Sequence, residues 1–242
     1  MIGFRQFSLT RAVATACFCS CAGIVATPAQ QFDASTVVQH IDAAAQARYD
    51  SILSFTVTEH YAVYRNNDET HPAAEMTVKT TYRRGIGKSY AILSHSGSEI
   101  LRRFVLAPLL DNEKSINQPA NVDKSWFTSA NYDMKLKPGG IQRLAGRDCL
   151  ALALTPKRKA PNMIEGTLWV DVHDDSIVQI DGIASRSPSV FAGPTQMMRQ
   201  YTNMNGFAMA AHARAESDSV LFGRTILTID YRDYQIQLRP TK

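Results

Sequence analysis

Residues 146–157 read GRDCLALALTPK, and this stretch decides the fold class. Leu150, Leu152 and Leu154 alternate with smaller residues, so the leucines share one face of an extended strand. The opposite face carries the small residues Cys149, Ala151 and Ala153. Since a strand that is apolar on both faces lies inside a protein, we expect a helix or a ligand to cover the face with the small residues. A strand enclosed in a filled core is the alternative.

Further alternating stretches lie on both sides of this strand, and short turn-rich connectors such as residues 137–140 and 172–175 separate them. Antiparallel strands can follow one another through such connectors, whereas parallel strands need long crossovers. The sequence therefore predicts an antiparallel meander of about ten strands. Besides residues 147–155, the expected strands are residues 54–65, 76–82, 90–92, 131–136, 167–172, 176–183, 196–202, 207–217 and 224–237.

Two stretches depart from the period of two and predict helices. Residues 36–49 have apolar side chains at helical spacing, and Thr36 with Gln39 fits a capping box at the start. The stripe on this helix consists of Val37, Val38, Ile41, Ala44, Ala45 and Arg48. Residues 98–115 form a second amphipathic segment, which Pro108 kinks or divides. Together these elements predict an α+β fold with one domain over residues 30–242.

The composition of the 242 residues is that of an ordinary globular protein, with 45% apolar and 20% charged residues. It argues against a disordered, collagen-like or coiled-coil chain. The formal net charge of +4 is small and scattered, so we expect no nucleic-acid partner. The basic run Lys157–Lys159 is typical of a solvated loop, although anionic lipid headgroups or an acidic partner would also fit it.

The first 29 residues have the features of a secretory signal peptide. Arg5 and Arg11 precede an uncharged run over residues 12–26, which is shorter than the about 20 residues that a membrane-spanning helix needs. We therefore expect an exported periplasmic protein that is cleaved after Ala29. A cut near Ala22 and a lipid anchor on Cys21 are the alternatives.

Cleavage after Ala29 would leave Cys149 as the single cysteine of the mature chain. A single cysteine cannot form an intramolecular disulfide. Because Cys149 alternates with leucines in a predicted strand, we expect an inert, buried thiol.

Three further patterns resemble chemical motifs. Gly87-Lys88-Ser89 resembles the end of a phosphate-binding loop, but Tyr82 occupies the position of the required first glycine, so a hairpin turn is expected. The six histidines lack zinc-ligand spacing, and the acidic residues 171–175 around His173 are typical of a solvated turn. We expect neither a metal nor another cofactor.

Residues 94–98 place His95 among serines, without the elbow motif of a serine hydrolase. The stretch favours a polar turn that enters the second helix, with Ser96 or Ser98 as the N-cap. A hydrolase that uses Ser96 or Ser98 with a distant histidine and aspartate is the enzymatic alternative. Since no candidate nucleophile has its partner in the sequence, we expect a protein that is not an enzyme.

The later part of the chain resembles exported bacterial proteins of the outer-membrane lipoprotein-sorting (LolA-like) family. The motifs that carry the resemblance are residues 146–157, Gly166-Thr167-Leu168-Trp169-Val170-Asp171, residues 177–182 and Ile229-Asp230-Tyr231-Arg232-Asp233-Tyr234. The resemblance covers roughly residues 36–238. It implies a strongly curved, half-open antiparallel barrel whose concave face is covered by helices and holds acyl chains.

The expected function is that of a monomeric carrier for acyl chains of lipids or lipoproteins, with membrane-bound release or receptor proteins as possible partners. Burial of an acyl chain gives about 0.8 kcal/mol per methylene, so binding needs no catalytic group. We expect a cavity between the sheet and residues 98–115, and the alternative is a concave face that the helices fill completely. The expected lining residues are Phe55, Val57, Met76, Val78, Leu101 and Phe104. An envelope-stress sensor or protein-interaction module with the same fold is the alternative function.

Overall fold

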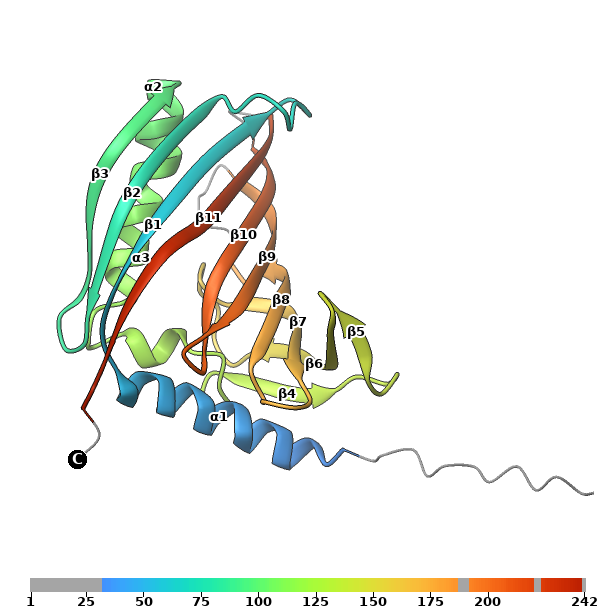
Figure 1. Cartoon of the computed structure of the whole chain (residues 1–242). Helices are drawn as coiled ribbons and strands as arrows, with labels where there is room; N and C mark the ends of the chain where they lie inside the picture. The colour runs from blue at the N-terminus through green and yellow to red at the C-terminus, as the bar shows by residue number, and fades with distance from the viewer. Residues whose placement is uncertain (1–31, 187–191, 220–222, 241–242) are drawn as a thin grey trace, which may run out of the picture. The chain divides into compact units, whose positions relative to one another are not determined.

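The computed structural model of the chain describes residues 32–186, 192–219 and 223–240 (Figure 1). The expected signal peptide, its cleavage site after Ala29 and the alternative lipid anchor at Cys21 lie outside the described residues. Phe32–Lys242 form one compact unit of the chain. Within the described residues, no helix is both long and apolar enough to cross a membrane.

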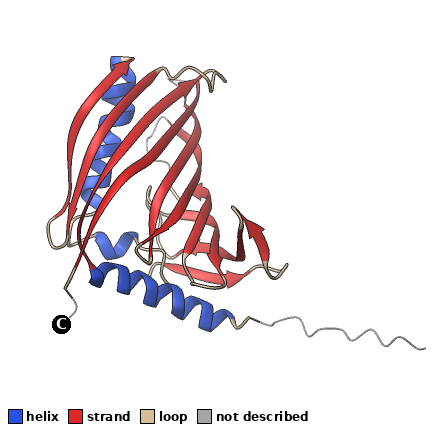
Figure 2. Ribbon diagram, in the orientation of Figure 1, coloured by secondary structure: helices blue, strands red, loops and turns tan. Residues whose placement is uncertain are grey.

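The unit is built on one antiparallel sheet of eleven strands in the order β3-β2-β1-β11-β10-β9-β8-β7-β6-β4, with β5 also paired to β6. The bounds are β1 Ile52–Arg65, β2 Ala74–Arg83, β3 Gly87–Gly97, β4 Tyr132–Leu136, β5 Gln142–Leu144, β6 Arg147–Pro156, β7 Ile164–Asp171, β8 Ile177–Ala184, β9 Ala192–Met204, β10 Phe207–Ser219 and β11 Gly223–Leu238. In the described part of the chain, β3 and β4 are the ends of the strand order, so the curved sheet does not close (Figure 2). The α+β class with a half-open antiparallel sheet is confirmed.

The ten strands predicted from alternation are all present, and the structure adds β5. This strand has three residues, too few for an alternating pattern to show, and only its pairing with β6 defines it. The expected hairpin at Gly87 is also confirmed, because β2 and β3 pair antiparallel from Arg83↔Gly87 onward. In contrast, residues 94–97 continue β3 instead of forming the expected turn.

Helix α1 spans Ala34–Ser51 and packs on the inner face of β6, β7 and β8. Its N-cap is Asp33, whose carboxylate accepts hydrogen bonds from the backbone N–H groups of Ser35 and Thr36. The expected capping box of Thr36 with Gln39 is therefore wrong. An aspartate three residues earlier already satisfies these N–H groups, so the helix starts before Thr36. The Ser35 and Thr36 hydroxyls also donate to this carboxylate, and these hydroxyl bonds, with smaller contributions from the backbone N–H groups, lower the pKa of Asp33 to about 2.

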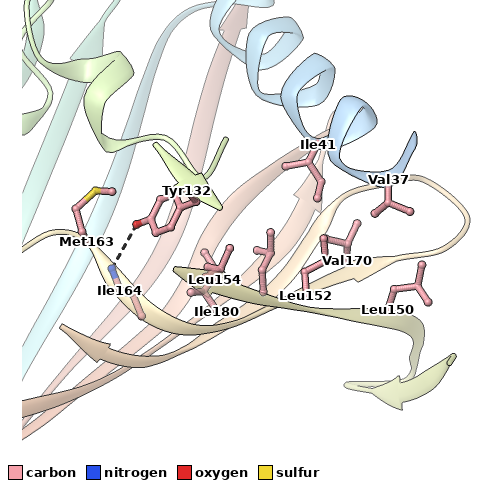
Figure 3. Packing of buried hydrophobic residues seen from close by; sticks show 11 residues of the cluster. Val37, Ile41, Tyr132, Leu150, Leu152, Leu154, Met163, Ile164, Val170 and Ile180 are labelled. Carbon is pink, nitrogen blue, oxygen red and sulfur yellow. Dashed lines mark hydrogen bonds between the residues drawn. The ribbon is translucent and has the colours of Figure 1, made fainter. Parts of the chain in front are cut away.

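The first hydrophobic core lies between α1 and the sheet (Figure 3). Val37 and Ile41 of α1 point toward the leucines of β6, and Leu152 is fully buried there. Tyr132 closes one end of this core, where its hydroxyl oxygen accepts a hydrogen bond of 3.3 Å from the Ile164 N–H. Burial raises the pKa of Tyr132 to about 12.

The covering helix lies on the leucine face of β6, which corrects the expectation that a helix or ligand covers the face with the small residues. The branched side chains of Val37 and Ile41 pack where large apolar partners are available, and alanines offer little surface to a helix. The opposite face is nevertheless buried at Cys149 and Ala151. Trp169 is the cross-strand partner of Ala151 and shares that face.

The second predicted helical segment is confirmed as three consecutive pieces: α2 Glu99–Leu101, a π-helix over Arg102–Leu106, and α3 Ala107–Ile116. The Ser98 hydroxyl caps α2, as one of the two expected caps. Pro108 lies in the first turn of α3 and has no N–H to donate to the carbonyl four residues before it. Just ahead of it, the Ala107 N–H donates to the Arg102 carbonyl in the π pattern, so the segment is divided at the proline, as expected.

Candidate functional site

The inner face of the sheet is defined by alternate residues of β1. Phe55, Val57, Glu59, Tyr61 and Val63 are all buried and point to the side on which the helices pack. The register carries this face across the sheet, because cross-strand partners share a face. Ile229 and Tyr231 of β11, for example, are the partners of Tyr61 and Glu59.

The structure places the six expected lining residues in three environments. Met76, Val78 and Leu101 lie together in a second core with Leu106 and Leu110. Phe55 and Val57 belong to a third core, where the Phe55 ring stacks on Tyr82 with centroids 5.0 Å apart. Phe104 is on the surface and is 62% exposed.

An ion cluster lies on the inner face between the helical segment and the sheet. Glu113 of α3 is 2.8 Å from the Nζ of Lys88 and 3.9 Å from a guanidinium nitrogen of Arg199 in β9. Burial alone would raise the pKa of Glu113, but the two cations outweigh it and hold this pKa below its usual value. One carboxylate on a helix therefore balances cations from two distant strands.

Tyrosines surround this ion cluster. The Tyr61 hydroxyl donates to the buried carboxylate of Glu59. The Tyr90 hydroxyl oxygen is buried and has no hydrogen-bond partner among the described residues. Burial raises the pKa of Tyr61, Tyr90 and Tyr231, and nearby carboxylates add to the effect. The centre of the inner face is thus amphipathic, with aromatic rings between apolar cores and a few charges.

Arg48 enters the same face from the last turn of α1. Its side chain interacts electrostatically with Tyr82, Tyr201 and Tyr234, and its Nη2 lies 3.7 Å from the sulfur of Met209. This arginine therefore lies at the edge of the third core, close to Tyr82 and Met209.

The inner face is open at the β3 edge. Ile92 of β3 is the cross-strand partner of Val78, so both side chains point to the inner side. Val78 is fully buried in the second core, whereas Ile92 is 50% exposed. Ile100 and Phe104, on the helical segment that follows β3, are also exposed by more than half. Leu93 of β3 is also 59% exposed, so four large apolar side chains near this edge are in contact with water.

A separate surface pocket of about 450 Å³ lies at the other end of the sheet, where Val38 of α1 meets β4 and β6. Lys135, Lys157 and Asp133 give it a polar rim. In the described residues, no group of three or more His, Cys, Asp or Glu side chains is arranged to hold a metal ion.

The polar centre was not predicted from the sequence, although two residues indicate it. Glu59 occupies a position in the apolar phase of the alternating stretch 54–65, where a charged residue is out of place. Arg48 likewise belongs to the apolar stripe of the first helix. A charge in the apolar phase of an amphipathic element indicates a buried polar site.

Comparisons of the sequence find no relative. No protein-family model matches the chain, and no curated protein matches it.

Comparison with solved structures finds neighbours of low sequence identity. A LolA superfamily protein from Nitrosomonas europaea has a TM-score of 0.47 and 13% identity, over 87% of this chain and 96% of that chain. A domain described as an outer membrane lipoprotein-sorting protein from Vibrio parahaemolyticus has a TM-score of 0.49 and 13% identity, over 85% and 94%. A DUF1329 family protein from Desulfovibrio piger has a TM-score of 0.44 and 14% identity, over 86% and 94%. Two of these three neighbours bear the name of the family that the sequence motifs resemble.

Proposed function

We propose that the protein is a periplasmic, non-enzymatic carrier that binds the acyl chains of lipids or lipoproteins on the inner face of its half-open sheet. It would receive and release this cargo at membranes, in contact with release or receptor proteins. The function rests on apolar contact, so it requires no catalytic group or cofactor.

The observation that carries the proposal is the difference in exposure between Val78 and its cross-strand partner Ile92. Both side chains point to the inner side, yet the one on the edge strand is half exposed to water. Apolar groups that stay exposed beside a hydrophobic core are typical of a binding surface. An acyl chain laid along β3 would cover Ile92 and extend the second core.

The helical segment beside this edge supports the same interpretation. Leu101 and Leu106 hold it on the sheet, while Ile100 and Phe104 face solvent. A π-helix is strained relative to an α-helix and is frequent at functional sites. We propose that this segment, residues 99–116, moves away from the sheet when a chain binds.

A fluorescent fatty acid offered to the folded protein tests the proposal. Saturable binding that phospholipid displaces is expected, and native mass spectrometry of protein purified from a periplasm should show bound lipid. Failure to bind at tens of micromolar would reject the carrier function and leave the interaction module.

Two matched variants locate the site. Ile92→Lys should weaken binding of the fatty acid about tenfold or more, because it places a charge where the chain lies. Ile86→Lys is the control, since Ile86 is 67% exposed and lies in the turn before β3, outside the paired strands. Equal effects of the two substitutions would contradict the assignment to the β3 edge.

A further inference from the structure

Arg48 is a cation on the inner face that no carboxylate of the described residues balances. Its one hydrogen bond there runs to the sulfur of Met209, and its Nε atom is buried and has no partner in the same residues. Asp50, the carboxylate nearest in sequence, accepts instead from Arg84 and Gln46. Arg48 therefore differs from Lys88 and Arg199, the other two cations of the inner face described above, which share Glu113.

Burying a charge without a partner is unfavourable, and a guanidinium cannot escape the cost by losing its proton. Burial lowers the pKa of Arg48, but arginine remains charged at neutral pH. The carboxyl end of α1 offsets part of the charge through the helix dipole. That dipole brings no acceptor to the Nε atom, so the cation stays incompletely satisfied.

Arg199 is an arginine of the same face that does have a carboxylate nearby, and it serves as a comparison for Arg48. It lies 3.9 Å from Glu113, which also binds Lys88. In the described residues, Lys88 and Arg199 share the carboxylate of Glu113, and Arg48 is in no ion pair.

The group in contact with Arg48 is one that a ligand can displace. Met209 is buried, but its unbranched side chain adopts several shapes, and a thioether sulfur is a weak acceptor. Tyr82 and Tyr234 interact electrostatically with the guanidinium, and both belong to the third core or pack against it. An oxygen that replaced the Met209 sulfur would find an unused N–H donor in an apolar surrounding.

We propose that Arg48 binds the anionic head, a carboxylate or a phosphate, of the amphiphile whose chain lies on the inner face. A guanidinium can donate two parallel hydrogen bonds to two oxygens of one carboxylate or of one phosphate, so its geometry suits both head groups. This inference rests on the proposed carrier function and adds to it the class of cargo: an acyl chain with a single negative head.

The experiment compares one fluorescent fatty acid with its methyl ester, which keeps the chain and removes the charge. We expect the wild-type protein to bind the acid about tenfold more tightly than the ester. In Arg48→Met this ratio should fall to about one, with binding of the ester unchanged. Arg214→Met is the control, since Arg214 pairs with Glu69 and Glu216, and it should keep the wild-type ratio.

The stability of the ligand-free protein gives a second readout. If the guanidinium serves to bind an anion, Arg48→Met should leave the melting temperature unchanged or raise it, because a cation with a buried, unpaired Nε is removed. A purely structural arginine would lower it. A clear loss of stability together with an unchanged acid-to-ester ratio would overturn the proposal.

The remaining outcomes separate this inference from the carrier function. If acid and ester bind the wild-type protein equally well, Arg48 does not bind the head group and this inference is rejected, while binding of acyl chains still stands. If neither probe binds, the carrier function itself fails. Inorganic phosphate at millimolar concentration should not compete with the fatty acid, and competition as strong as that of the acid would show a site for free anions and overturn the proposal.

Discussion

A carboxylate oxygen of Glu113 in α3 lies 3.9 Å from a guanidinium nitrogen of Arg199 in β9, although the two residues are far apart in the chain. The same carboxylate is 2.8 Å from Lys88 of β3, which is five strands away from β9 in the sheet order. In a flat sheet these strands would be about 24 Å apart. Side chains from β3 and β9 can reach one carboxylate only because the sheet curls around the helix. The triad of Lys88, Glu113 and Arg199 therefore connects two distant strands of the curved sheet.

Replacing Glu113 tests that triad. Glu113→Gln would leave Lys88 and Arg199 without their shared anion, and we expect a loss of about 2 kcal/mol in the free energy of unfolding, which is less than for a fully buried pair. Urea denaturation followed by circular dichroism measures it. Glu99→Gln is the control, since its ion pair with Arg102 is exposed and should contribute nothing measurable. A stable Glu113→Gln protein would mean that the triad does not hold the curve.

Acid should weaken the same contact. The pKa of Glu113 is below its ordinary value in the folded state, so the unfolded state takes up a proton first as the pH falls. The stabilisation is complete above the unfolded pKa of about 4.5 and is lost as the pH drops through the folded pKa. Melting temperatures measured from pH 7 to pH 3 should fall more steeply for the wild-type protein than for Glu113→Gln. Parallel curves would contradict this assignment.

Cys149 should react slowly in the folded protein. Its side chain is fully buried and its sulfur lies 3.6 Å from the Arg147 carbonyl oxygen. Burial also raises the pKa of the thiol, which keeps it protonated. We expect little reaction with a thiol reagent in native buffer and rapid reaction in denaturant. Fast labelling of the native protein would show that β6 opens readily.

The first core should depend on Leu152. Its side chain is fully buried between α1 and the sheet, so Leu152→Ala should cost about 2–5 kcal/mol of stability. Ile183→Ala is a suitable comparison, because Ile183 of β8 is 41% exposed and should lose far less. Chemical denaturation of both variants measures the free energy of unfolding. Similar losses of free energy in the two variants would contradict the assignment of Leu152 to the core.

Much of the fold was predictable because its signals are local. Alternation with a period of two identified ten of the strands, and the connectors between them implied antiparallel neighbours. The short β5 escaped because three residues show no period. The N-cap at Asp33 was not predicted, because Thr36 with Gln39 matches a capping box. The cap depends on which side chain reaches the free N–H groups of the first turn, and that side chain is the carboxylate of Asp33.

The candidate site was predictable only in part. Alternation put Phe55, Val57, Met76 and Val78 on the inner face, but it could not tell which of two cores each joins. Helical spacing grouped Leu101 with Phe104, yet only Leu101 faces the sheet. Phe104 lies within the π-helix Arg102–Leu106, where the angle from one residue to the next differs from that of an α-helix, so regular helical spacing misplaces its side chain.

The sequence by itself determined the fold class, since apolar periodicity and turn residues act over a few neighbouring positions. Only the tertiary structure decided which charges meet. Lys88, Glu113 and Arg199 are far apart in the chain, and their contact depends on the curl accumulated over six strands. The same curl brings Arg48 to Met209 instead of to a carboxylate. Pairing of buried charges depends on distances of a few ångströms in space, and these distances are fixed only after every strand has found its register.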